Sequence, residues 1–244
     1  MFYLFVSVSI CGSFTYPSEV SLLLILHKKE NLCYFSPWRG IAPDPIMNGM
    51  NAKRMKLGVL GSGKGSNLVA IAEAAQAGEI PVDIVLVIAD SPDAGILSRA
   101  EFYGIPARYI SAGNSKTRLD GEAEQAYIQA LREAGAEWVA LAGFMRIVKA
   151  DFLKTFPNRV VNIHPSLLPA FQGLHAWKQA LDYGVKVTGV TVHYVDSGVD
   201  TGPIIAQAAV PVLEGDTPDT LHQRIQIEEH KIYPAVLKQL AALS

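Results

Sequence analysis

The chain has 244 residues, of which 50% are hydrophobic and 18% charged, and its 21 Lys and Arg nearly balance its 23 Asp and Glu. This composition excludes an intrinsically disordered chain, which would be poor in hydrophobic residues and strongly charged. Two cysteines, 20 glycines and 14 prolines exclude the disulfide-rich and collagen-like classes. A net charge of −2 argues against binding to nucleic acid or to an anionic membrane surface, so we expect neither partner.

The first 54 residues differ from the rest of the chain. They hold five Lys or Arg and three Asp or Glu, so residues 55–244 carry 16 and 20 and a net charge of −4. Their two apolar runs are shorter than the roughly 18 residues of a membrane-spanning helix. A secretory signal requires a basic residue before its apolar run, and none precedes the first run here. We expect residues 1–54 to be a poorly ordered leader or an upstream translation of a cytoplasmic protein. The working chain would begin at Met47, Met50 or Met55, with Met55 preferred.

From Lys56 onward, apolar runs typical of strands alternate with helical spacing. The predicted strands of this part are 57–60, 82–89, 107–110, 138–142 and 160–164, and the predicted helices are 68–75, 94–103, 119–134 and 148–156. Two β-branched runs, 185–195 and 204–210, then precede a long helix over 217–240. The alternation predicts a single α/β domain over 55–244, with a mostly parallel twisted sheet and helices on both faces, as in Rossmann-like folds. Ligands of such sheets bind at the carboxyl ends of the strands.

A glycine-rich loop, Gly61-Ser62-Gly63-Lys64-Gly65-Ser66-Asn67, joins the first predicted strand to the first predicted helix. Glycines let the backbone approach a ligand closely, and the free N–H groups at a helix start suit a phosphate. The loop fails the P-loop pattern, because Gly65 stands where Ser or Thr is required, and its glycine spacing fails the dinucleotide motif. A ligand-free turn and an anion site both remain open, and the loop does not say which phosphate would bind.

The strand 160–164 ends in a polar pair, Asn162 and His164, which lie two residues apart and therefore on one face. An amide that donates to an oxyanion, beside an imidazole that moves a proton, suits acyl transfer. A polar strand end closed by a His-Pro turn would show the same pattern. Asp196 and Asp200 lie in a later loop with Gly and Pro, where aspartates also serve turns. A carboxylate near His164 would raise the pKa of the imidazole, but the spacing does not show which aspartate is close.

Glu229 interrupts an apolar stripe on the last helix that is formed by Ile225, Ile232 and Val236. A buried acid is rarely left unpaired. Glu229 therefore has either an internal cation partner or a ligand that carries N–H or hydroxyl groups. The histidines show no zinc-type spacing and residues 55–244 lack cysteine, so we expect no metal.

Together these motifs resemble the phosphoribosylglycinamide formyltransferases, a family of folate-dependent formyltransferases. The resemblance runs from about Met55 to about Leu237 and rests on five blocks: 65–67, 141–147, 162–169, 195–203 and 228–234. It implies transfer of a formyl group from 10-formyltetrahydrofolate to the amine of 5′-phosphoribosylglycinamide, in de novo purine biosynthesis. The resemblance is compatible with a monomer or a homodimer.

The resemblance also implies roles for individual residues. The ribose phosphate would be bound by Gly65, Ser66 and Asn67, and the ribose or amide region of the substrate by Glu229. The folate pocket would be lined, largely through main chain, by Met145, Arg146, Ile147 and Val148, together with Asn162. The catalytic residues would be Asn162, His164 and Asp200. Lys116 and Arg118 are candidates for a basic residue that contacts the cofactor in relatives.

Four alternatives carry different expectations. A formyltetrahydrofolate hydrolase shares the core but has a regulatory domain in front, for which 54 residues without strand–helix alternation are too few. A methionyl-tRNA formyltransferase would need a basic surface for RNA, whereas the core here is acidic. Sugar-nucleotide formyltransferases usually lack the Gly-Ser-Asn loop. A non-catalytic phosphate-binding module would keep that loop and would not need Asn162, His164 and Asp200 together.

Overall fold

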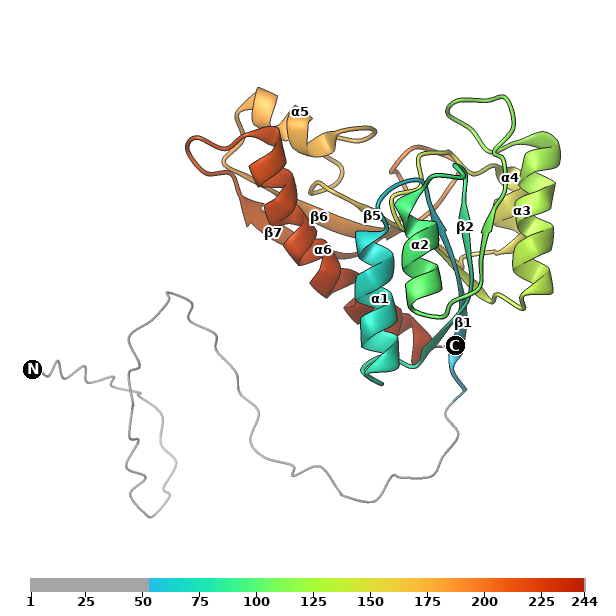
Figure 1. Cartoon of the computed structure of the whole chain (residues 1–244). Helices are drawn as coiled ribbons and strands as arrows, with labels where there is room; N and C mark the ends of the chain where they lie inside the picture. Colours follow the sequence, from blue (N-terminus) through green and yellow to red (C-terminus); the bar gives the residue numbers. More distant parts are fainter. Residues whose placement is uncertain (1–52, 244) are drawn as a thin grey trace, which may run out of the picture. The chain divides into compact units, whose positions relative to one another are not determined.

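A computed structural model of the chain describes residues 53–243, so the prediction of a leader over 1–54 falls almost entirely outside the described residues. Within this range the chain forms seven strands: β1 (Met55–Gly61), β2 (Val82–Ala89), β3 (Ala107–Tyr109), β4 (Trp138–Leu141), β5 (Val160–His164), β6 (Val187–Tyr194) and β7 (Ile204–Pro211). Its six helices are α1 (Ser66–Gln76), α2 (Gly95–Phe102), α3 (Gly121–Glu133), α4 (Ala150–Thr155), α5 (Ala176–Tyr183) and α6 (Pro218–Ala241) (Figure 1).

All seven strands form one sheet in the order β3-β2-β1-β4-β5-β6-β7. β1 to β5 run parallel, β6 is antiparallel to β5, and β7 is antiparallel to β6. The predicted α/β class with a mostly parallel sheet is therefore confirmed. β2 and β5 have the bounds predicted from their apolar runs, because a strand buried on both faces has a nearly continuous hydrophobic sequence.

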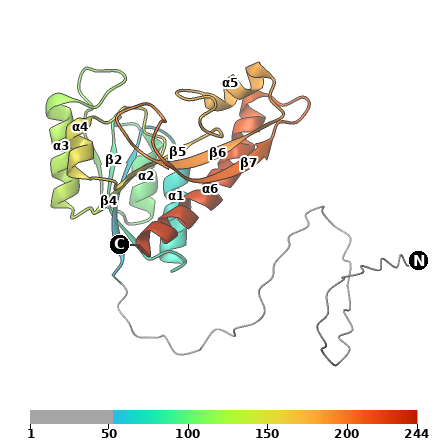
Figure 2. The same ribbon diagram turned by 180° about the vertical axis from the view of Figure 1, so that it is seen from behind.

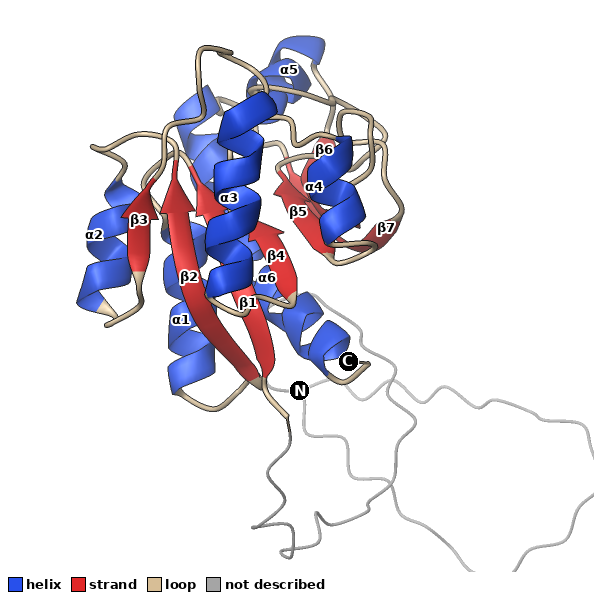
Figure 3. Cartoon of the chain, turned by 90° about the vertical axis from the view of Figure 1, so that its right-hand side faces the viewer, coloured by secondary structure: helices blue, strands red, loops and turns tan. Residues whose placement is uncertain are grey.

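Helices cover both faces of the sheet, as predicted. α1, α2 and α6 lie on one face, and α3 and α4 lie on the other (Figure 3). Successive residues of β1 alternate between two hydrophobic clusters: Val59 packs with the first group of helices and Leu60 with the second. Each fully buried side chain of this size stabilises the fold by about 1.5–3 kcal/mol, so the two clusters hold the sheet between its helical layers.

Of the six helices in residues 53–243, α5 alone is not predicted by the sequence pattern. It has eight residues, of which only Ala176 and Ala180 are fully buried, so it offers too few apolar positions for a helical period. Gly184 follows it at φ +82°, a left-handed conformation that commonly ends helices. That glycine is the sequence signal that could have indicated the helix. α5 packs against α6 (Figure 2).

α6 begins as its sequence predicts. The Thr217 hydroxyl accepts a hydrogen bond from the Thr220 N–H (3.2 Å), and the Thr220 hydroxyl accepts one from the Thr217 N–H (2.9 Å). Pro218 occupies the first turn, where its missing N–H has no cost. The helix continues through Pro234 to Ala241. Among residues 53–243, no helix combines the length and the apolar character that crossing a bilayer needs.

The strand order predicts where the sheet binds a ligand, namely at the carboxyl ends of β1 and β4. The order reverses between β1 and β4, because the chain moves outward to β2 and β3 before it returns to β4. A crevice at such a reversal, outside the carboxyl ends of the strands, is where open α/β sheets bind ligands. The glycine loop leaves β1 at this point and residues 142–149 leave β4 there.

Candidate functional site

The glycine loop at the carboxyl end of β1 has a conformation that only glycine suits. Gly65 has φ +78°, and a Cβ atom on it would lie 2.8 Å from the Cα of Ile96. The N–H of Ile96, in the first turn of α2, donates to the carbonyl of Gly63 (3.0 Å) and fixes the loop against that helix. Among the described residues no side chain caps the start of α1, and free N–H groups at a helix start are suited to an anion. The shape of the loop is compatible with an anion site, and anion binding stays a prediction.

Glu229 lies beside the last residue of this loop. Asn67 Nδ2 donates a hydrogen bond to Glu229 Oε2 (3.0 Å), and the two residues are 8% and 5% exposed. Of the two partners expected for Glu229, an internal cation is wrong for the side chains described here, since an amide holds the carboxyl group. Burial raises the pKa of Glu229, and the bond from Asn67 opposes that shift. Asn67 Oδ1 is buried without a partner among the described residues, which leaves an acceptor for a ligand N–H or hydroxyl group.

Asn162, His164 and Asp200 come together at the carboxyl end of β5. His164 Nδ1 lies 3.3 Å from Asp200 Oδ2, and Asn162 Nδ2 lies 3.4 Å from Asp200 Oδ1. The His164 side chain is 6% exposed and that of Asp200 12% exposed. Asp200 is therefore the aspartate that lies near His164, a point that the spacing in the sequence leaves open. Asp196 instead binds the N–H of Gly198 within its own turn (3.0 Å).

The surroundings of His164 have opposite effects on the pKa of its imidazole. Its Nε2 lies 2.9 Å from the carbonyl oxygen of Phe171 and its Nδ1 faces Asp200, so each ring nitrogen has an acceptor for a proton. Burial nevertheless lowers the pKa of His164, and Asp200 and the Phe171 carbonyl only partly offset this effect. In its charged form the imidazole can donate from both nitrogens, and burial makes that form give up a proton more readily.

Asp200 is held as an ionised acceptor. Burial acts to raise its pKa, but contacts with His193 and His164 and the N–H of Gly173 (2.9 Å) outweigh burial, so the pKa of Asp200 is lowered. The residue has φ +53°, a left-handed conformation that is uncommon outside glycine and concentrates at functional sites. Gln172 Nε2 fixes its backbone by donating to the Asp200 carbonyl (3.1 Å).

His193 belongs to the same cluster, and the sequence analysis did not identify it as a site residue. It lies on β6 opposite Asn162 in the antiparallel register. Its Nε2 is 3.2 Å from Asn162 Nδ2 and 3.6 Å from Asp200 Oδ1, and its side chain is 3% exposed. Its Nδ1 donates to the Tyr194 carbonyl (2.8 Å), which fixes the ring. The pairing of β6 with β5 could have indicated this neighbour, but register across strands is not readable from one sequence.

Four of the residues predicted to line a folate pocket, Met145 to Val148, follow β4, and the fifth, Asn162, lies on β5. The Met145 N–H donates to Ser62 Oγ (2.9 Å), which ties the segment 145–148 to the glycine loop. The Arg146 guanidinium is already bonded, through Nε to Asp90 Oδ2 (2.7 Å) and through Nη1 to the Ser115 carbonyl (2.5 Å). Val148 is buried, and the Met145 side chain is exposed. The Arg146 side chain therefore bonds to the protein itself, which is compatible with the prediction that this segment contacts folate largely through its main chain.

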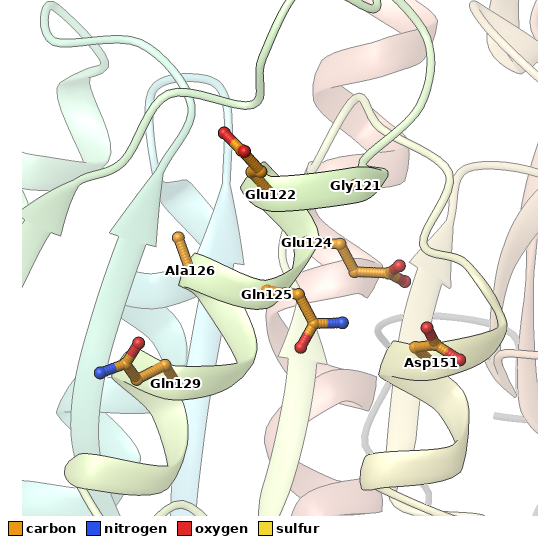
Figure 4. A pocket seen from close by; sticks show the side chains of 7 residues that line it. All are labelled: Gly121, Glu122, Glu124, Gln125, Ala126, Gln129 and Asp151. Atoms are coloured by element: carbon orange, nitrogen blue, oxygen red, sulfur yellow. The ribbon is translucent and has the colours of Figure 1, made fainter.

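A separate pocket of about 470 Å³ lies between α3 and α4 (Figure 4) and shares no residue with the cluster around His164. It contains three acids, Glu122, Glu124 and Asp151. Glu124 Oε1 accepts hydrogen bonds from the N–H groups of Lys149 (3.1 Å) and Phe152 (3.2 Å) at the start of α4, so this acid caps a helix. Within residues 53–243, no group of three or more His, Cys, Asp or Glu is placed to hold a metal ion.

Comparisons with known proteins agree with this geometry. The formyl transferase family profile matches residues 55–237. The phosphoribosylglycinamide formyltransferase of Bacillus subtilis (strain 168) is 44% identical over 189 residues, which cover 78% of this chain and 96% of that protein. The trifunctional purine biosynthetic protein adenosine-3 of Homo sapiens is 44% identical over 190 residues, which cover 78% of this chain and 19% of that protein. The crystal structure of glycinamide ribonucleotide transformylase 1 from Symbiobacterium toebii has a TM-score of 0.75 at 47% identity and covers 80% of this chain and 93% of its own. The matched residues include all seven strands and every residue predicted for the site.

Proposed function

The chain belongs to the formyl transferase family, and on that premise we propose that it transfers the formyl group of 10-formyltetrahydrofolate to the amine of 5′-phosphoribosylglycinamide, a step of purine biosynthesis. The family resemblance inferred from the sequence is confirmed. The observation that carries the proposal is the cluster of Asn162, His164 and Asp200 on the same sheet edge as the loop of Gly65 and Asn67.

The chemistry assigns a task to each member of this cluster. The substrate amine forms a bond to the formyl carbon, the bond from that carbon to the folate nitrogen breaks, and one proton passes from the amine to the folate nitrogen. In this step Asn162 and protonated His164 turn N–H groups, which face Asp200, His193 and the Phe171 carbonyl in the free protein, toward the formyl oxygen and stabilise the negative charge that develops on it. Asp200, held as a carboxylate, keeps His164 oriented and favours its charged form.

The two ends of the substrate have separate binding groups. The free N–H groups at the start of α1, with Gly65, Ser66 and Asn67, fit a phosphate. Glu229 and the unpartnered Asn67 Oδ1 fit hydroxyl and N–H groups of the ribose or amide region. Main chain of 145–148, together with Asn162, binds the folate. No step requires a metal, and we place the enzyme in the cytoplasm, as a monomer or a homodimer.

An absorbance assay of deformylation tests this function directly. Purified protein receives 10-formyl folate with and without glycinamide ribonucleotide. Formyl loss only in the presence of the ribonucleotide supports the transferase. Formyl loss without it identifies a hydrolase, and no loss in either mixture contradicts both activities. The variant His164→Ala, assayed beside the wild type, excludes a contaminating enzyme as the source of the signal.

Residues 55–244 form the catalytic domain in this proposal, and a chain that begins at Met55 retains the activity. Lys53 pairs with the partly buried Glu137 (3.0 Å), and Arg54 pairs with Asp83 (2.5 Å). Lys53, Arg54 and Asp83 are exposed, and ion pairs at the surface contribute little stability. A chain that begins at Met50 keeps Lys53 and Arg54 and can form both ion pairs, whereas a chain that begins at Met55 lacks both residues. Equal activity of both chains and of the full chain supports the domain boundary, and loss of activity in both shorter chains overturns it.

A further inference from the structure

Asp90 makes an ion pair that crosses the functional edge of the sheet. It is the first residue after β2, and its partner Arg146 lies in the segment that leaves β4. β1 lies between these two strands in the sheet, so the pair spans the end of β1 next to the glycine loop. Arg146 Nε lies 2.7 Å from Asp90 Oδ2, with side chains 20% and 5% exposed. A pair so little exposed is screened far less than a surface pair.

Besides the ion pair with Asp90, Arg146 makes a hydrogen bond to the segment 115–119. Its Nη1 donates to the carbonyl of Ser115 (2.5 Å). Ile147, the next residue, donates to the Thr117 carbonyl (2.9 Å) and accepts from the Leu119 N–H (3.0 Å). Residues 115–119 therefore run along 146–147 like a short additional strand, anchored at one end by Arg146 and at the other by buried Leu119.

Two cations, Lys116 and Arg118, lie on the anchored segment with exposed side chains. Both are candidates for contact with the cofactor, and the segment 146–148 beside them belongs to the folate site of the proposed function. The direction in which the two cations point depends on the path of residues 115–119. That path depends in turn on Arg146, which Asp90 holds in place.

We propose that Asp90 is a positioning residue for the folate co-substrate: it holds the Arg146 guanidinium against the Ser115 carbonyl and so fixes residues 115–119 beside the folate-binding main chain of 146–148. Asp90 acts through Arg146 and touches no reacting atom. The inference rests on the proposed function for the identity of the ligand. The clamp itself is a property of the free protein and is tested without any ligand.

Limited trypsin digestion of the full chain tests the clamp, because trypsin cleaves after Lys116 and Arg118. Asp90→Asn keeps the shape of the side chain and removes its charge, so Arg146 loses a charge-assisted bond. We expect cleavage at these two sites, mapped by mass spectrometry, to become about tenfold faster, as the loss of one such bond implies. Unchanged cleavage overturns the proposal.

The matched control is Asp216→Asn. Asp216, in the loop between β7 and α6, pairs with Arg224 on α6 (2.7 Å), and their side chains are 4% and 27% exposed. The substitution removes the charge of Asp216 and so weakens an Asp–Arg pair that is similarly buried but lies elsewhere in the fold. Cleavage after Lys116 and Arg118 stays at the wild-type rate in this control. Faster cleavage in both variants would reflect general destabilisation and would overturn the local clamp.

Steady-state kinetics test the positioning role. In Asp90→Asn we expect the KM for 10-formyltetrahydrofolate to rise about tenfold, while kcat and the KM for the ribonucleotide stay within about twofold. Arg146→Lys keeps the charge but lacks the planar fork that bonds two acceptors, so it gives the same pattern. A wild-type folate KM in both variants, with faster cleavage, overturns the positioning role and leaves the clamp purely structural. An inactive wild-type protein contradicts the proposed function, whereas the trypsin result still decides the clamp.

Discussion

At the scale of single residues, His164 and its neighbours make the sharpest prediction. His164→Ala lowers kcat/KM by about 100–1,000-fold, the usual cost of removing a donor to a developing oxyanion. Asp200→Asn also lowers it, because the carboxylate that faces His164 Nδ1 at 3.3 Å is lost. Asp196→Asn is the control, since Asp196 bonds within its own turn. Wild-type activity of Asp200→Asn, or equal losses in Asp196→Asn and Asp200→Asn, would contradict the assignment.

The protonation of His164 is a second prediction for a single residue. Burial lowers the pKa of His164 and Asp200 acts against that effect, so an NMR titration of the wild-type ring has its midpoint below the ordinary value of about 6.5. Asp200→Asn removes the opposing charge and moves the midpoint lower still. A midpoint that rises in this variant would show that Asp200 does not stabilise the charged imidazole.

At the scale of elements, the turn from β1 into α1 depends on one glycine. Gly65→Ala forces a Cβ to within 2.8 Å of the Cα of Ile96 at φ +78°, and the left-handed conformation alone costs about 1–2 kcal/mol. We expect a lower free energy of unfolding in urea and a KM for the ribonucleotide raised about tenfold or more. Gly63→Ala is the matched control, because a Cβ there meets no atom within 4 Å. Equal KM values in the two variants would argue against a phosphate site at the start of α1.

Elements also show how far the sequence predicts the structure. The sequence predicts both bounds of β2 and β5 correctly, because a strand buried on both faces has a largely hydrophobic composition. Asn162 and His164 could be paired for a related reason, since a spacing of two fixes a shared face. His193 reaches the site because the register of β6 places it opposite Asn162. Asp90 reaches it through an ion pair with Arg146, which lies 56 residues later in the sequence. Neither relation leaves a local pattern, so neither residue could be found before the fold was known.

At the scale of the whole molecule, buried and partly buried histidines set the response to acid. Burial lowers the pKa values of His164, His222 and His230 below about 6.5. Asp219 opposes the shift at His222, where Lys64 and His175 add to it, and Glu73 opposes the shift at His230. The unfolded chain therefore binds more protons than the folded chain as the pH falls through about 6.5, and unfolding becomes easier. Glu229 acts in the opposite sense, because its raised pKa lets the folded state take up a proton first.

Three groups that favour unfolding in acid outnumber the one that opposes it, so the Tm falls as the pH is lowered from about 7.5 to about 5.5. Each histidine contributes at most about 1.4 kcal/mol per pH unit, the value of one bound proton. Calorimetry across this range checks the slope. His230→Gln, which alters neither the catalytic cluster nor the glycine loop, should flatten the dependence on pH, and Glu229→Gln should steepen it. A Tm that rises on acidification would contradict this prediction. An unchanged slope in both variants would mean that His230 and Glu229 bind protons equally in the folded and unfolded chains.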